Sequence, residues 1–203
     1  MKKRPLFFSC LLFVYLFSLS QAKYENGTPK SEGKMETGMR SGLWTFYYPS
    51  GEISALLIYN DDMLDGEQKY FNEEGQLIAL EQWKSDLQED SSHYYYPNGQ
   101  LEKKGVFKSG LYQGKWVFYY ENGNQKRTGY YELGQPQGQW MFYHESGQLN
   151  QKGKLKDGKE DGFWEYFDEG GIKTYDGSWK EGKEVGQWFF YKNGKKKKWK
   201  NFD

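Results

Sequence analysis

The chain has 203 residues, of which 20% are aromatic, but its mean hydropathy is only −1.00, so Trp, Tyr and Phe must supply most of any buried surface. It carries 28 basic and 28 acidic residues, and without a leader that holds three of the basic ones it is slightly acidic, which argues against sequence-independent nucleic-acid binding. The lone cysteine, Cys10, falls in that leader, so the mature chain has no cysteine for a disulfide, a zinc-thiolate site or a nucleophile.

The first 22 residues have the pattern of a secretory signal peptide. Residues 2–4 are basic, residues 6–19 are apolar, and small residues precede an expected cleavage point between Ala22 and Lys23. The apolar run is shorter than the roughly 20 residues that span a bilayer as a helix. We therefore expect export through a cleavable leader to the periplasm, the cell surface or the medium.

Two other fates of the leader stay open. It could be retained as an uncleaved anchor, or the chain could be lipidated at Cys10, because residues 7–10 faintly resemble a lipobox. The intact mass of the exported protein distinguishes these fates. The next segment, residues 23–31, is expected to be a polar lead-in.

Residues 32–203 form a tandem array with a period of 24 residues. The repeated phrase is Gly-x-Trp-x-Phe/Tyr-Tyr, and weaker copies begin at Gly66 and Asp90, which gives seven units. A fixed period in this range indicates a repeat architecture. The residues that define the repeat are Gly42, Trp44, Phe46, Gly114, Trp116, Phe118, Gly138, Trp140, Phe142, Gly162, Trp164, Gly186 and Trp188.

Each unit reads as a β-hairpin. An alternating strand is followed by a turn that ends in glycine, such as Glu121-Asn122-Gly123, and then by a return strand. The later units carry a glycine inside the return strand, for example Gly129, which marks a close approach to the backbone and predicts that an aromatic ring of a neighbouring strand covers it. A five-residue link closes each unit. The predicted fold is all-β: an elongated, single-layer twisted sheet of about seven hairpins.

Two regions depart from the period. In units two and three the tryptophan position holds Gln68 and Ser92, which indicates a weakened seam or a place where a partner supplies what is missing. The last unit has a shorter turn and ends in Lys195–Lys200 without a complete return strand. Charged residues there suit a cap against edge-to-edge pairing, and could also attach the array to an anionic surface.

The phrase, the turn and the glycine-bounded link together resemble the MORN-repeat variant family, in the bacterial form common among antitoxin-like repeat proteins. The resemblance covers about residues 30–198. It implies a twisted sheet of hairpins that serves as a scaffold for proteins or membranes, with no catalytic residues. The leader conflicts with neutralising a cytoplasmic toxin, and the slightly acidic charge disfavours anionic lipid.

The two faces of the sheet have different expected roles. The tryptophans are interpreted as the ladder that holds the hairpins together. The tyrosines of the other face could form a continuous exposed groove for sugars or an extended peptide. This candidate binding face consists of Tyr47, Tyr95, Tyr119, Tyr143 and Tyr191.

We find no pattern in the sequence that predicts a catalytic, metal or cofactor site. His93 and His144 occupy unequal places in their units, and the acidic pairs fall in turns and links. The leading hypothesis is a non-enzymatic exported scaffold for protein–protein interaction at the cell envelope, with an unidentified protein partner. The alternatives are a carbohydrate-binding repeat protein of the envelope and a scaffold associated with a membrane surface.

Overall fold

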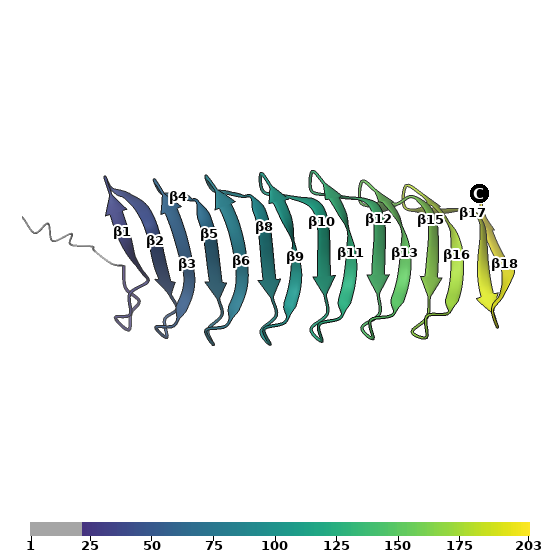
Figure 1. Cartoon of the computed structure of the whole chain (residues 1–203), viewed down its shortest axis with the longest axis horizontal. Coiled ribbons are helices and arrows are strands. Elements are labelled where there is room, and N and C mark those ends of the chain that lie inside the picture. The colour runs from purple at the N-terminus through teal and green to yellow at the C-terminus, as the bar shows by residue number, and fades with distance from the viewer. Residues whose placement is uncertain (1–21) are drawn as a thin grey trace, which may run out of the picture.

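The computed structural model describes residues 22–203, which form one open antiparallel sheet with no helix (Figure 1). Each strand pairs with the next along the chain, so successive repeats follow one another along the long axis. This confirms the predicted all-β hairpin array. The predicted leader lies outside the described residues except for Ala22, and so does Cys10.

Eighteen strands make up the sheet in the described part of the chain. The strands β4, β7 and β14 are short, and each continues into the strand that follows it. The strands are β1 (Ser31–Glu36), β2 (Met39–Tyr47), β3 (Ile53–Asn60), β4 (Met63–Leu64), β5 (Gly66–Phe71), β6 (Leu77–Lys84), β7 (Leu87–Gln88), β8 (Asp90–Tyr95), β9 (Leu101–Lys108), β10 (Leu111–Tyr119), β11 (Gln125–Glu132), β12 (Gln135–Tyr143), β13 (Leu149–Lys156), β14 (Lys159–Glu160), β15 (Gly162–Phe167), β16 (Lys173–Lys180), β17 (Lys183–Lys192) and β18 (Lys195–Phe202).

The repeat pattern begins earlier than the sequence suggested, within the polar lead-in expected over residues 23–31. Tyr24 N–H donates to Thr28 O at 2.8 Å and Gly27 N–H to Tyr24 O at 2.9 Å, which repeats the turn that joins β2 to β3. β1 then pairs with β2 as a return strand. The turn and β1 together are therefore the closing half of an additional unit.

The link between units is a two-residue turn rather than a five-residue connection. Between β9 and β10, only Ser109 and Gly110 lie outside the ladder, with φ of 50° and 76°. Two successive positive φ values are typical of the tight hairpin turn whose twist matches the strands. Gly114, with φ of 67°, lies at a register shift in the paired strand, so the glycines at the start of each phrase are bulge positions.

Leu133 occupies the first position of one such turn with φ of 49°, and its side chain is 73% exposed. A leucine is strained in this conformation, whereas Asn is favoured. We expect Leu133→Asn to raise the free energy of unfolding by about 0.5–1 kcal/mol. Denaturant titration of both proteins checks this. An unchanged or lower midpoint would contradict the turn assignment.

The core is a ladder of tryptophans, each lying on a bare glycine of the preceding strand. A Cβ added to Gly129 would lie 2.1 Å from Trp140 Cδ2, closer than any real contact. This confirms the predicted role of the strand glycines. The pairs are Gly33–Trp44, Gly105–Trp116, Gly129–Trp140, Gly153–Trp164 and Gly177–Trp188.

Units two and three replace both members of this pair, because a tryptophan cannot lie on a residue with a Cβ. Leu57 and Glu81 take the glycine position, and Gln68 and Ser92 take the tryptophan position. Gln68 is fully buried, and its Nε2 donates to Ile58 O at 3.1 Å, ten residues back. Trp116 Nε1 makes the same bond to Val106 O at 3.0 Å, so the amide of Gln68 replaces the indole N–H.

The third unit fills the space with a buried carboxylate. Glu81 accepts hydrogen bonds from Trp83 Nε1 at 2.8 Å and from Tyr94 O–H at 2.7 Å. Burial, followed by the Glu81 hydrogen bond, raises the pKa of the Tyr94 hydroxyl. Polar side chains of the chain itself therefore fill the core of units two and three. This favours a seam with an altered core over a place where a partner supplies what is missing.

The last unit does have a complete return strand, contrary to expectation. β18 pairs with β17 from Lys195 to Phe202 through a two-residue turn at Asn193-Gly194. Trp199 and Phe202 lie edge-on to Trp188, with ring centroids 6.4 and 6.1 Å away. Aromatic residues of the edge strand therefore cover the last tryptophan of the ladder.

Candidate functional site

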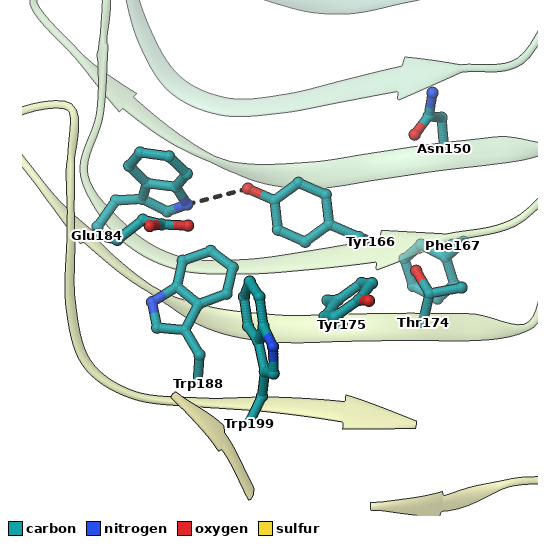
Figure 2. A pocket seen from close by; sticks show the side chains of 9 residues that line it. Asn150, Tyr166, Phe167, Thr174, Tyr175, Glu184, Trp188 and Trp199 are labelled. Carbon is teal, nitrogen blue, oxygen red and sulfur yellow. Dashed lines mark hydrogen bonds between the residues drawn. The ribbon is translucent and has the colours of Figure 1, made fainter. Parts of the chain in front are cut away.

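A pocket of about 400 Å³ lies at the C-terminal end of the tryptophan face, the face that carries the tryptophan ladder (Figure 2). Strands β13 and β15–β18 provide its walls. Its lining is mainly aromatic with a few polar groups, the composition typical of a binding site. The lining residues are Asn150, Tyr166, Phe167, Thr174, Tyr175, Trp179, Glu184, Trp188 and Trp199.

The pocket lies beside Trp188, the last tryptophan of the ladder in the described chain. In earlier units the next tryptophan covers the return strand, but in the described chain no further unit comes after Trp188, and Trp199 reaches over from the edge strand instead. Trp188 is thereby only 3% exposed, but Trp199 itself remains 50% exposed and Tyr175 40% exposed. Large aromatic surface is thus left open to solvent at one end of the array.

The rings are inclined to one another. Tyr175 and Trp199 have centroids 5.2 Å apart and planes at 58°. Trp199 meets Trp188 at 70°, and Trp179 meets Trp188 at 81°. Figure 2 shows the Trp199 ring standing between those of Trp188 and Tyr175. The arrangement forms a shallow, open hollow whose rings face in several directions.

Glu184 is the one charged residue of the lining. It pairs with Trp179 across β16 and β17, and the Trp179 indole N–H donates to the hydroxyl oxygen of Tyr166 at 3.0 Å. Burial raises the pKa of Tyr166 to about 12, the carboxylates of Glu160 and Glu184 add to this, and the Trp179 bond acts against it. The site therefore combines aromatic faces with a negative local charge.

The raised pKa of Tyr166 predicts a loss of stability at alkaline pH. Its ordinary value is 10.0. A group whose pKa is higher in the folded state contributes fully to the free energy of unfolding at pH values below its pKa in the unfolded state. It loses that contribution as the pH rises towards its pKa in the folded state, here from 10 towards 12. Denaturant midpoints across this range should fall more steeply for the wild type than for Tyr166→Phe. Equal slopes would contradict the assignment.

The predicted tyrosines lie on the opposite face, here called the tyrosine face, and they are half-buried rather than exposed. Tyr191 O–H donates to Asp176 Oδ2 at 2.6 Å, Tyr143 O–H to the sulfur of Met141 at 3.4 Å, and Tyr47 O–H to Glu32. Tyr95, Tyr119 and Tyr143 are two strands apart, about 10 Å, but Phe71 and Phe167 occupy the equivalent positions that separate Tyr47 and Tyr191 from them. Residues of the return strands also lie between successive members, so tyrosines do not line the expected groove continuously. As a binding face, Tyr47, Tyr95, Tyr119, Tyr143 and Tyr191 stay a prediction.

A second ladder was missed in the sequence. Tyr48, Tyr96 and Tyr120 each donate a hydrogen bond to a backbone carbonyl 23 residues further on, at 2.7–2.9 Å. His144 Nε2 lies 3.0 Å from Phe167 O at the equivalent place. The signal was a hydrogen-bonding side chain that recurs with the period. His144 therefore links adjacent units, while His93 lines a shallow hollow on the tyrosine face.

The predicted cleavage point lies at the start of the described chain. Lys23 forms an isolated bridge with Pro29, and Lys30 N–H donates to Ala22 O at 2.7 Å. Within residues 22–203, no three His, Cys, Asp or Glu side chains are grouped as a metal site. No helix of that part is long and apolar enough to cross a membrane.

Comparison with known proteins identifies the repeat. The family model described as MORN repeat variant matches about half of the chain, at residues 40–61, 64–85, 94–109, 112–133 and 136–157. No curated protein matches significantly. Among solved structures, the crystal structure of a GtfA/B complex bound to UDP and GlcNAc is 11% identical, with a TM-score of 0.25. The alignment covers 61% of this chain and only 25% of that one.

The matched residues coincide with the hairpins described above, from β2 to β13. MORN repeats are in general protein- or membrane-interaction repeats and are a non-enzymatic repeat type. The periodic tryptophans, the glycines beneath them and five matched repeats lead to one conclusion: the chain belongs to the MORN repeat variant family.

Proposed function

We propose that this protein is a non-enzymatic, exported repeat scaffold that binds a protein partner at the cell envelope. The family supports an interaction role, and the leader pattern over residues 1–22 supports export. The observation that carries the proposal is the C-terminal pocket, where Trp199 and Tyr175 lie half-exposed beside the last tryptophan of the ladder.

The chemistry of the pocket favours a protein side chain as its occupant. Tryptophan and tyrosine dominate the binding energy of protein interfaces because they bury much area at little entropic cost. A side chain of the partner can pack against the exposed rings of Trp199 and Tyr175. A polar rim is provided by Asn150 and Thr174 at the far end of the pocket from Glu184 (Figure 2).

The proposal is tested by crosslinking the mature chain, residues 23–203, to an envelope fraction of its native host. We expect one specific protein with the wild type and its loss with Trp199→Ala. Phe163→Ala is the matched control, because Phe163 is similarly exposed, at 53%, but lies on the tyrosine face. Loss of the partner with Phe163→Ala but not with Trp199→Ala would contradict the pocket and place the binding site on the tyrosine face.

A carbohydrate-binding role is the second candidate, because Trp199 and Tyr175 offer half-exposed rings of the kind that sugars stack on. Retention on cell-wall glycans, without recovery of any protein, would favour it and contradict the proposal. A membrane-surface role would rest on the exposed lysines of β18. Salt-sensitive binding to anionic vesicles, lost when Lys195–Lys198 are neutralised, would favour that role instead.

A further inference from the structure

In the middle of the array, basic side chains of the chain lie over aromatic rings of the tryptophan face. Lys103 Nζ lies 4.1 Å from the ring centroid of Tyr94, and Arg127 Cζ lies 4.2 Å from that of Phe118. Each cation comes from the residue that pairs directly with the ring across the hairpin. Lys103 Nζ also contacts the hydroxyl of Tyr112 at 3.2 Å. A ring below and an oxygen acceptor beside it therefore hold the ammonium group.

The C-terminal pocket is the same place three repeats further along, without the cation. Tyr166 stands at the position of Tyr94, and Tyr175 pairs with it as Lys103 pairs with Tyr94. Glu184 stands at the position of Tyr112. The basic side chain has thus been replaced by an uncharged ring, and the hydroxyl acceptor by a carboxylate.

In the described chain, this replacement leaves the Glu184 carboxylate without a basic side chain beside it. Within residues 22–203, no Lys or Arg forms an ion pair with Glu184, although seven other ion pairs are present. The aromatic cluster of Tyr166, Tyr175, Trp188 and Trp199 opens beside it. The faces of aromatic rings attract cations, and the attraction is stronger where water is excluded. The geometry suits an ammonium or guanidinium group entering from outside.

We propose that the C-terminal pocket binds an organic cation, the side chain of a lysine or arginine of the protein partner. The cation lies over Tyr166, is flanked by Trp199, and pairs with the Glu184 carboxylate. This inference rests on the proposed function for the origin of the cation, but the pocket's chemistry can be tested without the partner.

The test is an NMR titration of residues 23–203 with four small probes. These are N-acetyl-lysine amide, N-acetyl-arginine amide, tetramethylammonium and the uncharged N-acetyl-norleucine amide. We expect the two amino-acid cations to shift the Trp199 indole signal with millimolar affinity, and norleucine amide to leave it unchanged. Trp199→Phe identifies the signal.

Two variants assign the interaction to the pocket. Glu184→Gln should weaken lysine binding about fivefold, the upper range for an exposed ion pair. Tyr175→Lys should abolish it, because the new ammonium occupies the place that Lys103 occupies in the earlier unit. Circular dichroism and the unfolding midpoint confirm that both variants fold, so a loss of binding reports on the pocket.

Equal binding of norleucine amide would overturn the inference, and so would unchanged binding by Tyr175→Lys. Binding of tetramethylammonium without either amino-acid cation would overturn the assignment to a protein side chain. Crosslinking separates the two proposals. A partner that is retained by Glu184→Gln and Tyr175→Lys contradicts only this inference, whereas cation binding without any protein partner contradicts only the proposed function.

Discussion

Replacing Gly129 with leucine is expected to lower the free energy of unfolding by about 3 kcal/mol or more. Its Cβ would lie 2.1 Å from Cδ2 and 2.2 Å from Cε2 of Trp140, so the ring must leave the core or the strands must separate. Trp140 is only 2% exposed, so its ring cannot move without displacing its neighbours. Chemical denaturation of the variant measures the loss.

The chain itself contains the compensating change. Leu57 stands in the glycine position and Gln68 in the tryptophan position of the second unit, and both are buried. The double variant Gly129→Leu/Trp140→Gln copies this pair and should recover much of the stability that Gly129→Leu loses. A double-mutant cycle should therefore show strong favourable coupling. Additive losses would contradict the steric account of the degenerate units.

Trp140→Ala is expected to cost about 3–5 kcal/mol, the range for truncating a large buried aromatic residue. The ring packs against Tyr131 at 5.2 Å and Phe142 at 5.9 Å between centroids. Among residues 22–203 its Nε1 has no hydrogen-bond partner, so we expect the loss to come mainly from packing. Calorimetry or denaturant titration gives the magnitude.

The effect should also be local at first. In an array, each unit contacts only its neighbours, so units on either side of Trp140 should exchange their amide hydrogens faster before the ends do. Phe163→Ala, an exposed aromatic on the tyrosine face, serves as the control and should change stability by about 0.5 kcal/mol or less. A Trp140→Ala variant that melts like the wild type would refute the ladder.

The repeat period was enough to predict the hairpins and their main contact. Glycine weakens a strand unless a close approach to the backbone requires it, so Gly129 and its equivalents predicted a ring over the backbone, in agreement with the structure. The sequence shows that Gln68 and Ser92 replace tryptophan, but it does not show why. It becomes clear only when strand pairing places them beside Leu57 and Glu81.

The turns were harder to predict because residues other than glycine adopt positive φ in them. Asp61, Asp62 and Leu133 all do so, which hides the tight two-residue turn within a sequence that reads as a longer link. β18 was missed for another reason. Its run of lysines has no apolar alternation, and the strand forms because β17 offers a free edge.

The pocket could not be predicted from one unit, because it depends on the segment after the last tryptophan of the ladder. Trp199 covers Trp188 in place of a further repeat, and this leaves the neighbouring rings open. The sequence did contain one usable signal. The position that holds Lys103 and Arg127 in the middle units holds Tyr175 beside the pocket.

The most direct test of the account is recovery of a partner from the native envelope by crosslinking the mature chain. The account predicts one specific protein, captured by the wild type and by Phe163→Ala but not by Trp199→Ala, with no retention of cell-wall glycans. Capture that is equal for all three chains, or glycan retention without any protein, would contradict a protein-binding scaffold that acts through its open aromatic end.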